Sequence, residues 1–211
     1  NPLMAVQGYL QLATTFECEN ISDEGRGYLS EAGRAVERCM SMAEEMLMVS
    51  KLESRGLQLN LEPVNLTELA AEAIKDMKSQ QESKSIQLQV QTRHCMVAGD
   101  RRLLARVIHN LLSNALKFSP QEGRVEVNIA EQQQRLTLAV KDQGPGIPPE
   151  YHQTIFEKFG QAPSQFKRKG FGLGLTFCKL AVEAHGGRMY LQSTPQQGST
   201  FAFDLDLPVT S

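Results

Sequence analysis

The chain has 211 residues, 41% of them hydrophobic and 22% charged, with a formal net charge of −2. These values are enough for one large domain or two small ones with buried cores, and they exclude disorder as the main state. No apolar run has the length of a membrane span, and no secretory signal is visible. The net charge argues against a protein whose main role is to bind nucleic acid. Four cysteines lie far apart without a CxxC pair, which indicates reduced thiols. We therefore expect a cytoplasmic chain with neither membrane contact nor a nucleic-acid partner.

The charge is divided unevenly along the chain. Residues 1–60 contain five Lys/Arg and nine Asp/Glu, whereas residues 61–211 contain seventeen and fifteen. This asymmetry predicts two domains, 1–58 and 59–211. The sequence opens on Asn1-Pro2-Leu3 without an initiator Met, so we expect it to be a piece of a longer protein.

Two helices are predicted in the first domain. Apolar residues recur at steps of three and four over residues 3–13 and again over 28–49. The polar connection 17–24 is short, so the helices are expected to be antiparallel, the second running over about 24–54. Because two helices cannot bury so long a stripe, we expect a homodimer that forms a four-helix bundle. The alternative is a hairpin packed on the rest of the chain.

The second domain mixes strands and helices. Leucines alternate with polar residues over 57–61, which predicts an edge strand closed by Pro63. The elements predicted after it are a helix over 65–82 that starts with a capping box, strands 86–92 and 95–98, a helix from Asp100 to about Phe118, paired strands 125–131 and 136–142, a helix over 173–185, and strands 188–193 and 200–207. Strands interleaved with helices on one face predict an α+β two-layer sandwich.

Two asparagines share one face of the predicted helix that ends near Phe118. Asn110 and Asn114 are four residues apart, and Lys117 lies about one turn further on. Asn is a mediocre helix former, so such a pair is unexpected unless something polar binds there. Amide oxygens suit Mg²⁺, and a nearby Lys can balance phosphate charge. The alternative is two exposed asparagines on a solvated face.

Two glycine-rich turns flank a basic segment further along the chain. The turn 142–147 follows a predicted strand, and Asp142 could accept a hydrogen bond there from an exocyclic amine. The turn 170–175 opens a helix, where glycine N–H groups can cradle phosphate. Between them, Phe156 and Phe159 precede a polar basic stretch over 160–169, which predicts a mobile lid. An ordinary turn and a solvated loop with incidental charge are the alternatives.

Taken together, these segments resemble the nucleotide-binding domain of sensor histidine kinases, within the wider GHKL superfamily of gyrase-, Hsp90- and MutL-like ATPases. The resemblance covers essentially the whole chain. In family terms, the N, G1, F, G2 and G3 boxes are similar to residues 110–117, 142–146, 156–159, 170–174 and 198–201.

The resemblance implies ATP and Mg²⁺ as cofactors. It implies that Asn110 and Asn114 hold Mg²⁺ with the phosphates and that Lys117 contacts phosphate. Asp142 would read the adenine amine, supported by Thr200 through water. The remaining nucleotide-binding residues implied by the family come from the turns and the lid: Gly144, Gly146, Ile147, Phe159, Lys169, Gly170, Gly172, Leu173, Gly174 and Leu175.

The opening residues also resemble the family. Asn1-Pro2-Leu3 is similar to the end of the motif His-(Glu/Asp)-x-x-(Thr/Asn)-Pro-Leu, which would put the phosphoaccepting His four residues before Asn1. Asn1 would then orient water for dephosphorylating the partner regulator, and the 211 residues alone would not autophosphorylate.

The family implies a protein histidine kinase that passes the γ-phosphoryl group of ATP to that His and then to an Asp of a response regulator, with regulator phosphatase activity as an added role. One alternative is a hydrolytic ATPase of the same superfamily, but such enzymes place a Glu where Asn110 stands. The other is a degenerate dimeric module that sequesters a regulator, because Lys169 and Phe171 flank Gly170 where smaller residues are common.

Overall fold

A computed structural model of the chain describes residues 2–16, 22–54, 57–78, 85–161 and 171–208. By their internal contacts the residues form two units, Asn1–Met48 and Val49–Ser211. This division falls inside a helix, upstream of the boundary predicted at residue 58. The two units are described separately below.

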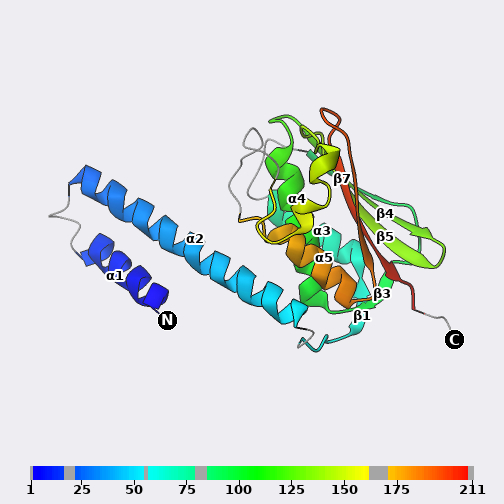
Figure 1. Cartoon of the computed structure of the whole chain (residues 1–211), viewed down its shortest axis with the longest axis horizontal. Coiled ribbons are helices and arrows are strands. Elements are labelled where there is room, and N and C mark those ends of the chain that lie inside the picture. The colour runs from blue at the N-terminus through cyan, green and yellow to red at the C-terminus, as the bar shows by residue number, and fades with distance from the viewer. Residues whose placement is uncertain (1, 17–21, 55–56, 79–84, 162–170, 209–211) are drawn as a thin grey trace. The chain divides into compact units, whose positions relative to one another are not determined.

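The first unit is helical, as predicted. Helix α1 spans Pro2–Phe16, and helix α2 spans Asp23–Glu53, its last residues belonging to the second unit (Figure 1). Acidic residues in the first turn and a basic residue in the last turn of α2 suit the helix dipole. Several large apolar side chains of this unit are exposed: Met4, Val6, Tyr9, Leu12, Tyr28, Met46 and Leu47. In the described residues, no helix combines the length and the apolarity that crossing a bilayer requires.

The second unit is built on a mixed five-stranded sheet with the strand order β2-β4-β5-β7-β6. Strands β2 and β4 are parallel, and all other neighbours are antiparallel. A separate antiparallel pair joins β1 to β3. The strands are β1 (Glu62–Asn65), β2 (Ser85–Val90), β3 (Met96–Gly99), β4 (Arg124–Gln132), β5 (Arg135–Lys141), β6 (Arg188–Ser193) and β7 (Ser199–Asp206).

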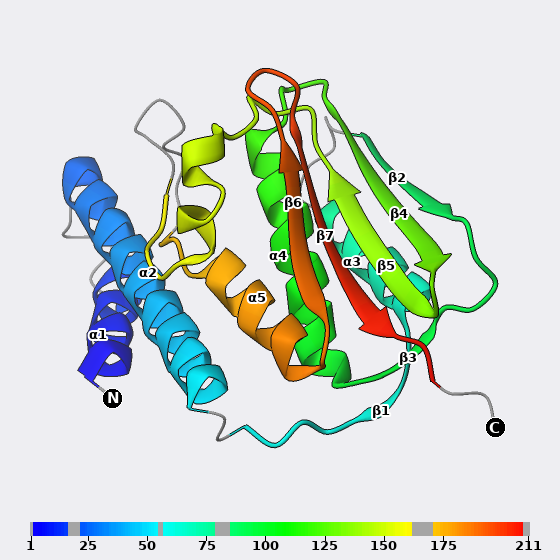
Figure 2. The same ribbon diagram turned by 45° about the vertical axis from the view of Figure 1, so that its right-hand side comes forward.

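Three helices cover one face of this sheet (Figure 2). They are α3 (Leu66–Lys78), α4 (Arg101–Phe118) and α5 (Gly174–Ala184). Burial alternates along the central strands, and the buried residues of β4 and β5 form the floor of the core under the helices: Val125, Val127, Ile129, Leu136, Leu138 and Val140. The predicted α+β two-layer sandwich is confirmed for this unit.

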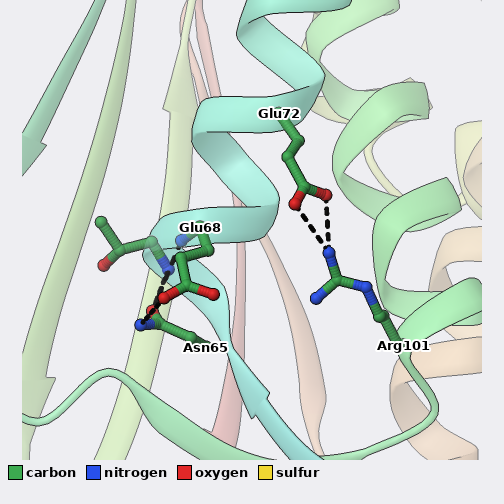
Figure 3. A network of polar contacts seen from close by, with 5 residues as sticks. Asn65, Glu68, Glu72 and Arg101 are labelled. Atoms are coloured by element: carbon green, nitrogen blue, oxygen red, sulfur yellow. Dashed lines mark hydrogen bonds and ion pairs between the residues drawn. The ribbon is translucent and has the colours of Figure 1, made fainter.

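The predicted capping box opens α3 (Figure 3). The Asn65 side chain accepts a hydrogen bond from the N–H of Thr67 at 3.0 Å, and its amide nitrogen donates to Glu68 at 3.0 Å. One turn later, both carboxylate oxygens of Glu72 accept from Arg101, at 2.8 and 2.7 Å. This pair links α3 to the first residue of α4, the helix that carries the asparagine pair.

The edge strand predicted over 57–61 is wrong. Strand β1 begins at Glu62 and contains Pro63, and it pairs with β3 from Glu62 to Asn65. Alternation of leucines is compatible with any extended chain, but a strand also needs a neighbour to which its backbone can hydrogen-bond. That neighbour is reached only after Leu61, and Pro63 is tolerated because β1 is an edge strand.

Candidate active site

Helix α4 presents a polar edge beside a buried face. Asn110, Asn114 and Lys117 are all half-buried, whereas four α4 residues among them are 0–2% exposed: Leu111, Leu112, Ala115 and Leu116. The 3.6-residue period therefore places the two amides and the ammonium along one edge of the core. The helix is started by Asp100, whose carboxylate accepts from the N–H groups of Arg102 and Leu103.

Asn110 is held by the first turn of α5. Its side-chain nitrogen donates to the carbonyl of Gly174 at 3.4 Å, which leaves the amide oxygen as the group that can meet a ligand. One turn along α5, the Cys178 thiol also interacts with the Asn110 side chain. Burial raises the pKa of the Cys178 thiol to about 12, so this sulfur stays protonated at neutral pH and is not a nucleophile.

Asp142 is a buried carboxylate, and one of its two oxygens accepts hydrogen bonds from backbone N–H groups. It is 4% exposed, and its Oδ1 accepts from the N–H of Gly144 at 2.7 Å and from the N–H of Ser199 at 3.2 Å. Burial raises the pKa of Asp142 above its usual value, and the two N–H donors partly oppose that rise. Within the described ranges no donor reaches Oδ2, which is therefore available to accept from a ligand.

Two glycines bring the turns around Asp142 into backbone contact. Gly146 has a φ of +69°, and a Cβ there would lie 2.0 Å from the carbonyl oxygen of Thr194. Gly198 has a φ of +81°, and a Cβ there would lie 2.1 Å from the carbonyl oxygen of Asp142. Only glycine fits both requirements, so the turn 142–147 and the β6–β7 turn 194–198 pack as one unit.

The turn after Asp142 also touches α4. A Cβ on Gly144 would lie 3.1 Å from the carbonyl oxygen of Phe118, the last residue of α4. The neighbouring Lys117 ammonium lies 4.9 Å from the centre of the Phe118 ring. Helix α4 therefore contacts α5 near Asn110 and the 142–147 turn at its end, so the predicted N, G1 and G2 segments adjoin one another.

The two ends of the predicted lid are tied together. The N–H of Phe159 donates to the carbonyl of Gly172 at 3.0 Å, and Phe156 makes an edge contact with Phe201 at 6.3 Å between ring centres. The Phe159 side chain itself is 48% exposed. Three predicted site residues, Asn1, Lys169 and Gly170, lie outside the described residues, as does most of the predicted lid.

The β7 residue whose backbone contacts Asp142 directly is Ser199, the neighbour of the predicted Thr200. The sheet pairs Thr200 with Lys141, and residues alternate along β7, so the Thr200 side chain lies on the face away from Asp142. Ser199 is 6% exposed; its carbonyl accepts from the N–H of Asp142 at 2.8 Å, and its own N–H donates to Oδ1 of Asp142 at 3.2 Å. Starting the predicted strand one residue earlier would have found it, because Ser199 shares the period-two phase of the buried Phe201 and Phe203.

The donor set fits a nucleotide-bound Mg²⁺. Within the described ranges, no three His, Cys, Asp or Glu residues lie close enough to hold a metal ion. Two amide oxygens do not complete the coordination shell of Mg²⁺, but they are hard ligands that suit this ion. Mg²⁺ ordinarily takes most of its ligands from water and phosphate. Asn110 and Asn114 therefore suit an ion that arrives with a phosphate ligand.

The sequence of the second unit matches a known family profile. Residues 99–209 match the family described as histidine kinase-, DNA gyrase B- and HSP90-like ATPases. The chain belongs to this family. The match spans α4, the turn 142–147, α5 and the β6–β7 turn, which are the elements that meet in the candidate site. Within this ATPase family, the resemblance to sensor histidine kinases is confirmed by the relatives below.

Two curated relatives are sensor kinases. The chain is 33% identical over 190 residues to the sensor protein kinase PmrB of Pseudomonas aeruginosa, covering 90% of this chain and 39% of PmrB. It is 30% identical over 210 residues to the sensor histidine kinase WalK of Bacillus subtilis, covering 97% of this chain and 34% of WalK. The chain thus spans less than half the length of these relatives.

A solved structure matches the whole chain. The crystal structure of full-length ShkA in complex with AMPPNP superposes with a TM-score of 0.84 at 25% identity, over 100% of this chain and 44% of ShkA. The neighbour's bound AMPPNP and the family profile together support ATP binding by this histidine kinase-type domain.

Proposed function

We propose that this chain is the ATP-binding core of a dimeric protein histidine kinase. The observation that carries the proposal is the hydrogen bonding of Asp142. One carboxylate oxygen accepts from two backbone N–H groups, while the other is available to a ligand. A buried acceptor of this kind suits the exocyclic amine of adenine. Asn110, Asn114 and Lys117 would then lie toward the phosphates.

The proposed reaction is an in-line phosphoryl transfer to a histidine that precedes Asn1 by four residues. An imidazole nitrogen forms a bond to the γ-phosphorus, the bond to the β,γ-bridging oxygen breaks, ADP leaves with that electron pair, and the imidazole proton passes to water. Catalysis consists mainly of positioning and charge neutralisation, to which Lys117 contributes. A bound Mg²⁺ would neutralise phosphate charge.

The proposed second step moves the phosphoryl group to an Asp carboxylate of a response regulator receiver domain. Asn1 would orient the water that hydrolyses the regulator's phosphoaspartate. The first helix is a suitable docking surface because residues 1–16 contain no charged side chain. Charged substitutions at Met4 and Val6, both exposed, should weaken regulator binding and leave ATP binding unchanged. Unchanged regulator binding would contradict this assignment.

The proposed dimer would bury other exposed apolar residues of the first unit, among them Tyr9 and Leu12 of α1. Tyr9 is 73% exposed and Leu12 is 51% exposed on the separate chain, which is costly for large apolar side chains unless a partner covers them. Sedimentation equilibrium should show a dimer for the wild type and a monomer for Tyr9→Lys/Leu12→Lys. Ser41→Lys, at an exposed polar position of α2, is the control for added charge. A wild type that is monomeric at micromolar concentration would contradict the dimer.

The kinase proposal is tested in two stages. The 211-residue chain should bind AMPPNP with Mg²⁺ in a calorimeter, and Asn114→Ala should remove the dependence of that binding on Mg²⁺. A longer form that includes the upstream His should then take an acid-labile, alkali-stable label from [γ-³²P]ATP. Nucleotide binding without any label would instead favour the non-catalytic module, and release of phosphate without label would favour a hydrolase.

A further inference from the structure

Ser193 joins the two turns that meet at Asp142. It is the last residue of β6 and pairs with Ser199, the first residue of β7. Its hydroxyl accepts from the N–H of Ile147 at 2.8 Å, donates to the carbonyl of Gly198 at 3.0 Å, and lies 2.9 Å from the Ser199 hydroxyl. One side chain therefore contacts both the turn 142–147 and the turn 194–198.

The direction of each hydrogen bond follows from proton counting. A serine hydroxyl has one proton, and the Gly198 carbonyl can only accept, so the Ser193 proton goes to Gly198. The Ser199 hydroxyl must then donate to Ser193. Ser193 thus accepts twice and donates once, which satisfies its hydrogen-bonding capacity.

These bonds lead directly to the Asp142 carboxylate. The Gly198–Ser199 peptide, whose carbonyl Ser193 holds, supplies the N–H that Oδ1 of Asp142 accepts. Ile147 is the last residue of the turn that begins at Asp142, and its N–H donates to the Ser193 hydroxyl. The Ile147 carbonyl accepts from the His152 ring at 2.9 Å. The orientation of Oδ2 therefore depends on two peptides that meet at one hydroxyl.

We propose that Ser193 is a positioning residue for base recognition, whose hydroxyl holds the two turns so that the free oxygen of Asp142 points at the exocyclic amine of the nucleotide base. This role deepens the proposed function and rests on it. Ser193 acts through Asp142 rather than by touching the nucleotide. Loss of its hydroxyl leaves the Ile147 N–H without its partner and lets the turns shift.

The test compares two nucleotides that differ at the recognised group. ADP carries the amine that Asp142 would accept from, whereas inosine diphosphate carries a carbonyl there. Ser193→Ala should weaken ADP binding about tenfold, as expected for a disturbed hydrogen bond to a charged group, and change inosine diphosphate binding less than about twofold. Ser193→Thr, which keeps the hydroxyl, should restore the preference for ADP.

Two controls separate positioning from general stability. Thr137→Ala also removes a half-buried strand hydroxyl, from β5, and should leave the preference between the two nucleotides unchanged. In a double-mutant cycle, Ser193→Ala should have little further effect on ADP binding once Asp142 is Asn, because the group through which it acts is gone. Binding is measured below the melting midpoint of each variant, and Ser193→Cys, a close match in volume with a weaker donor, substitutes if the alanine variant does not fold.

The outcomes separate this inference from the proposed function. A wild type that binds neither nucleotide contradicts the proposed function itself. A wild type that prefers ADP, with a Ser193→Ala variant that loses both nucleotides equally or loses neither, overturns only the positioning role. Additive effects in the cycle with Asp142→Asn overturn it as well.

Discussion

At the scale of single residues, the ionised Asp142 side chain lowers the stability of the ligand-free protein but provides an acceptor for a ligand. Burial opposes ionisation of its carboxyl, and two backbone N–H groups partly compensate. An acid whose pKa is raised in the folded state contributes stability that is fully present below its unfolded value of 3.8 and is lost as the pH rises through the folded pKa. At neutral pH the ionised side chain therefore lowers the stability of the ligand-free protein. Such a group is typical of a binding site.

Asp142→Asn should separate stability from binding. The amide oxygen can keep both backbone hydrogen bonds, while the amide nitrogen replaces the free acceptor. We expect a melting temperature at pH 7 that is equal to or above that of the wild type, and ADP binding weakened about 10- to 100-fold through loss of a charge-assisted hydrogen bond. Calorimetry measures both quantities. Glu150→Gln, at an exposed carboxylate, is the control, and a clear loss of stability in Asp142→Asn would contradict the argument.

The same carboxyl predicts a pH dependence of nucleotide binding. As the pH falls from 7 through the raised pKa of Asp142, protonation removes the charged acceptor and ADP affinity should drop. Protonation of the ADP phosphates also weakens binding, but equally in Asp142→Asn. The ratio of the two affinities should therefore shrink toward one in acid. A ratio that stays constant from pH 7 down to the lowest pH at which both proteins remain folded would show that Asp142 does not bind the base.

At the scale of elements, α4 carries the site because its ends are fixed. Asp100 caps its first turn, and its second carboxylate oxygen accepts from the N–H of Asn60 at 3.2 Å. The Asp100 N–H in turn donates to the His185 ring at 2.9 Å, just beyond the end of α5. The cap therefore links the start of α4 to α5, whose other end holds Asn110.

Asp100→Ala should destabilise the second unit without removing any site residue. Loss of an N-cap carboxylate costs about 1–2 kcal/mol, and here the N–H of Asn60 loses its acceptor as well. Urea denaturation should show this decrease, while ADP affinity measured under fully folding conditions stays within about twofold of wild type. The control is Glu122→Ala, an exposed acidic residue outside the helix. Equal stability of the two variants would rule out the cap.

At the scale of the whole molecule, the end of α2 belongs with the nucleotide-binding unit. Val49 and Leu52 are 1% and 7% exposed and fall within the unit Val49–Ser211. Glu53, near the end of the same helix, accepts from Lys158 at 2.5 Å, although this exposed ion pair contributes little. The division by internal contacts therefore lies upstream of the boundary that the charge asymmetry predicts at residue 58.

Two truncated chains test this boundary. Residues 49–211 keep both buried side chains, whereas residues 59–211 lack them. Burial of a Val and a Leu is worth about 1.5–3 kcal/mol each as an upper value. Because the denatured chain already buries part of this surface, the shorter chain should be less stable by about 2–5 kcal/mol in urea denaturation. Equal stabilities would favour the boundary predicted at residue 58.

Local pattern alone predicted the helices and most strands, because helix and strand periods and glycine turns are properties of neighbouring residues. The five ordered segments proposed to bind the nucleotide came from the resemblance to sensor histidine kinases, which is also carried by short stretches of neighbouring residues. The spacing of Asn110 and Asn114 and the position of Asp142 at a strand end belong to this class. Only the tertiary structure decided that residues 57–61 have no strand partner, that Ser199 is the β7 residue whose backbone contacts Asp142, and that Ser193 joins two turns. These features depend on contacts between segments far apart in the chain, and no local period encodes which segments meet.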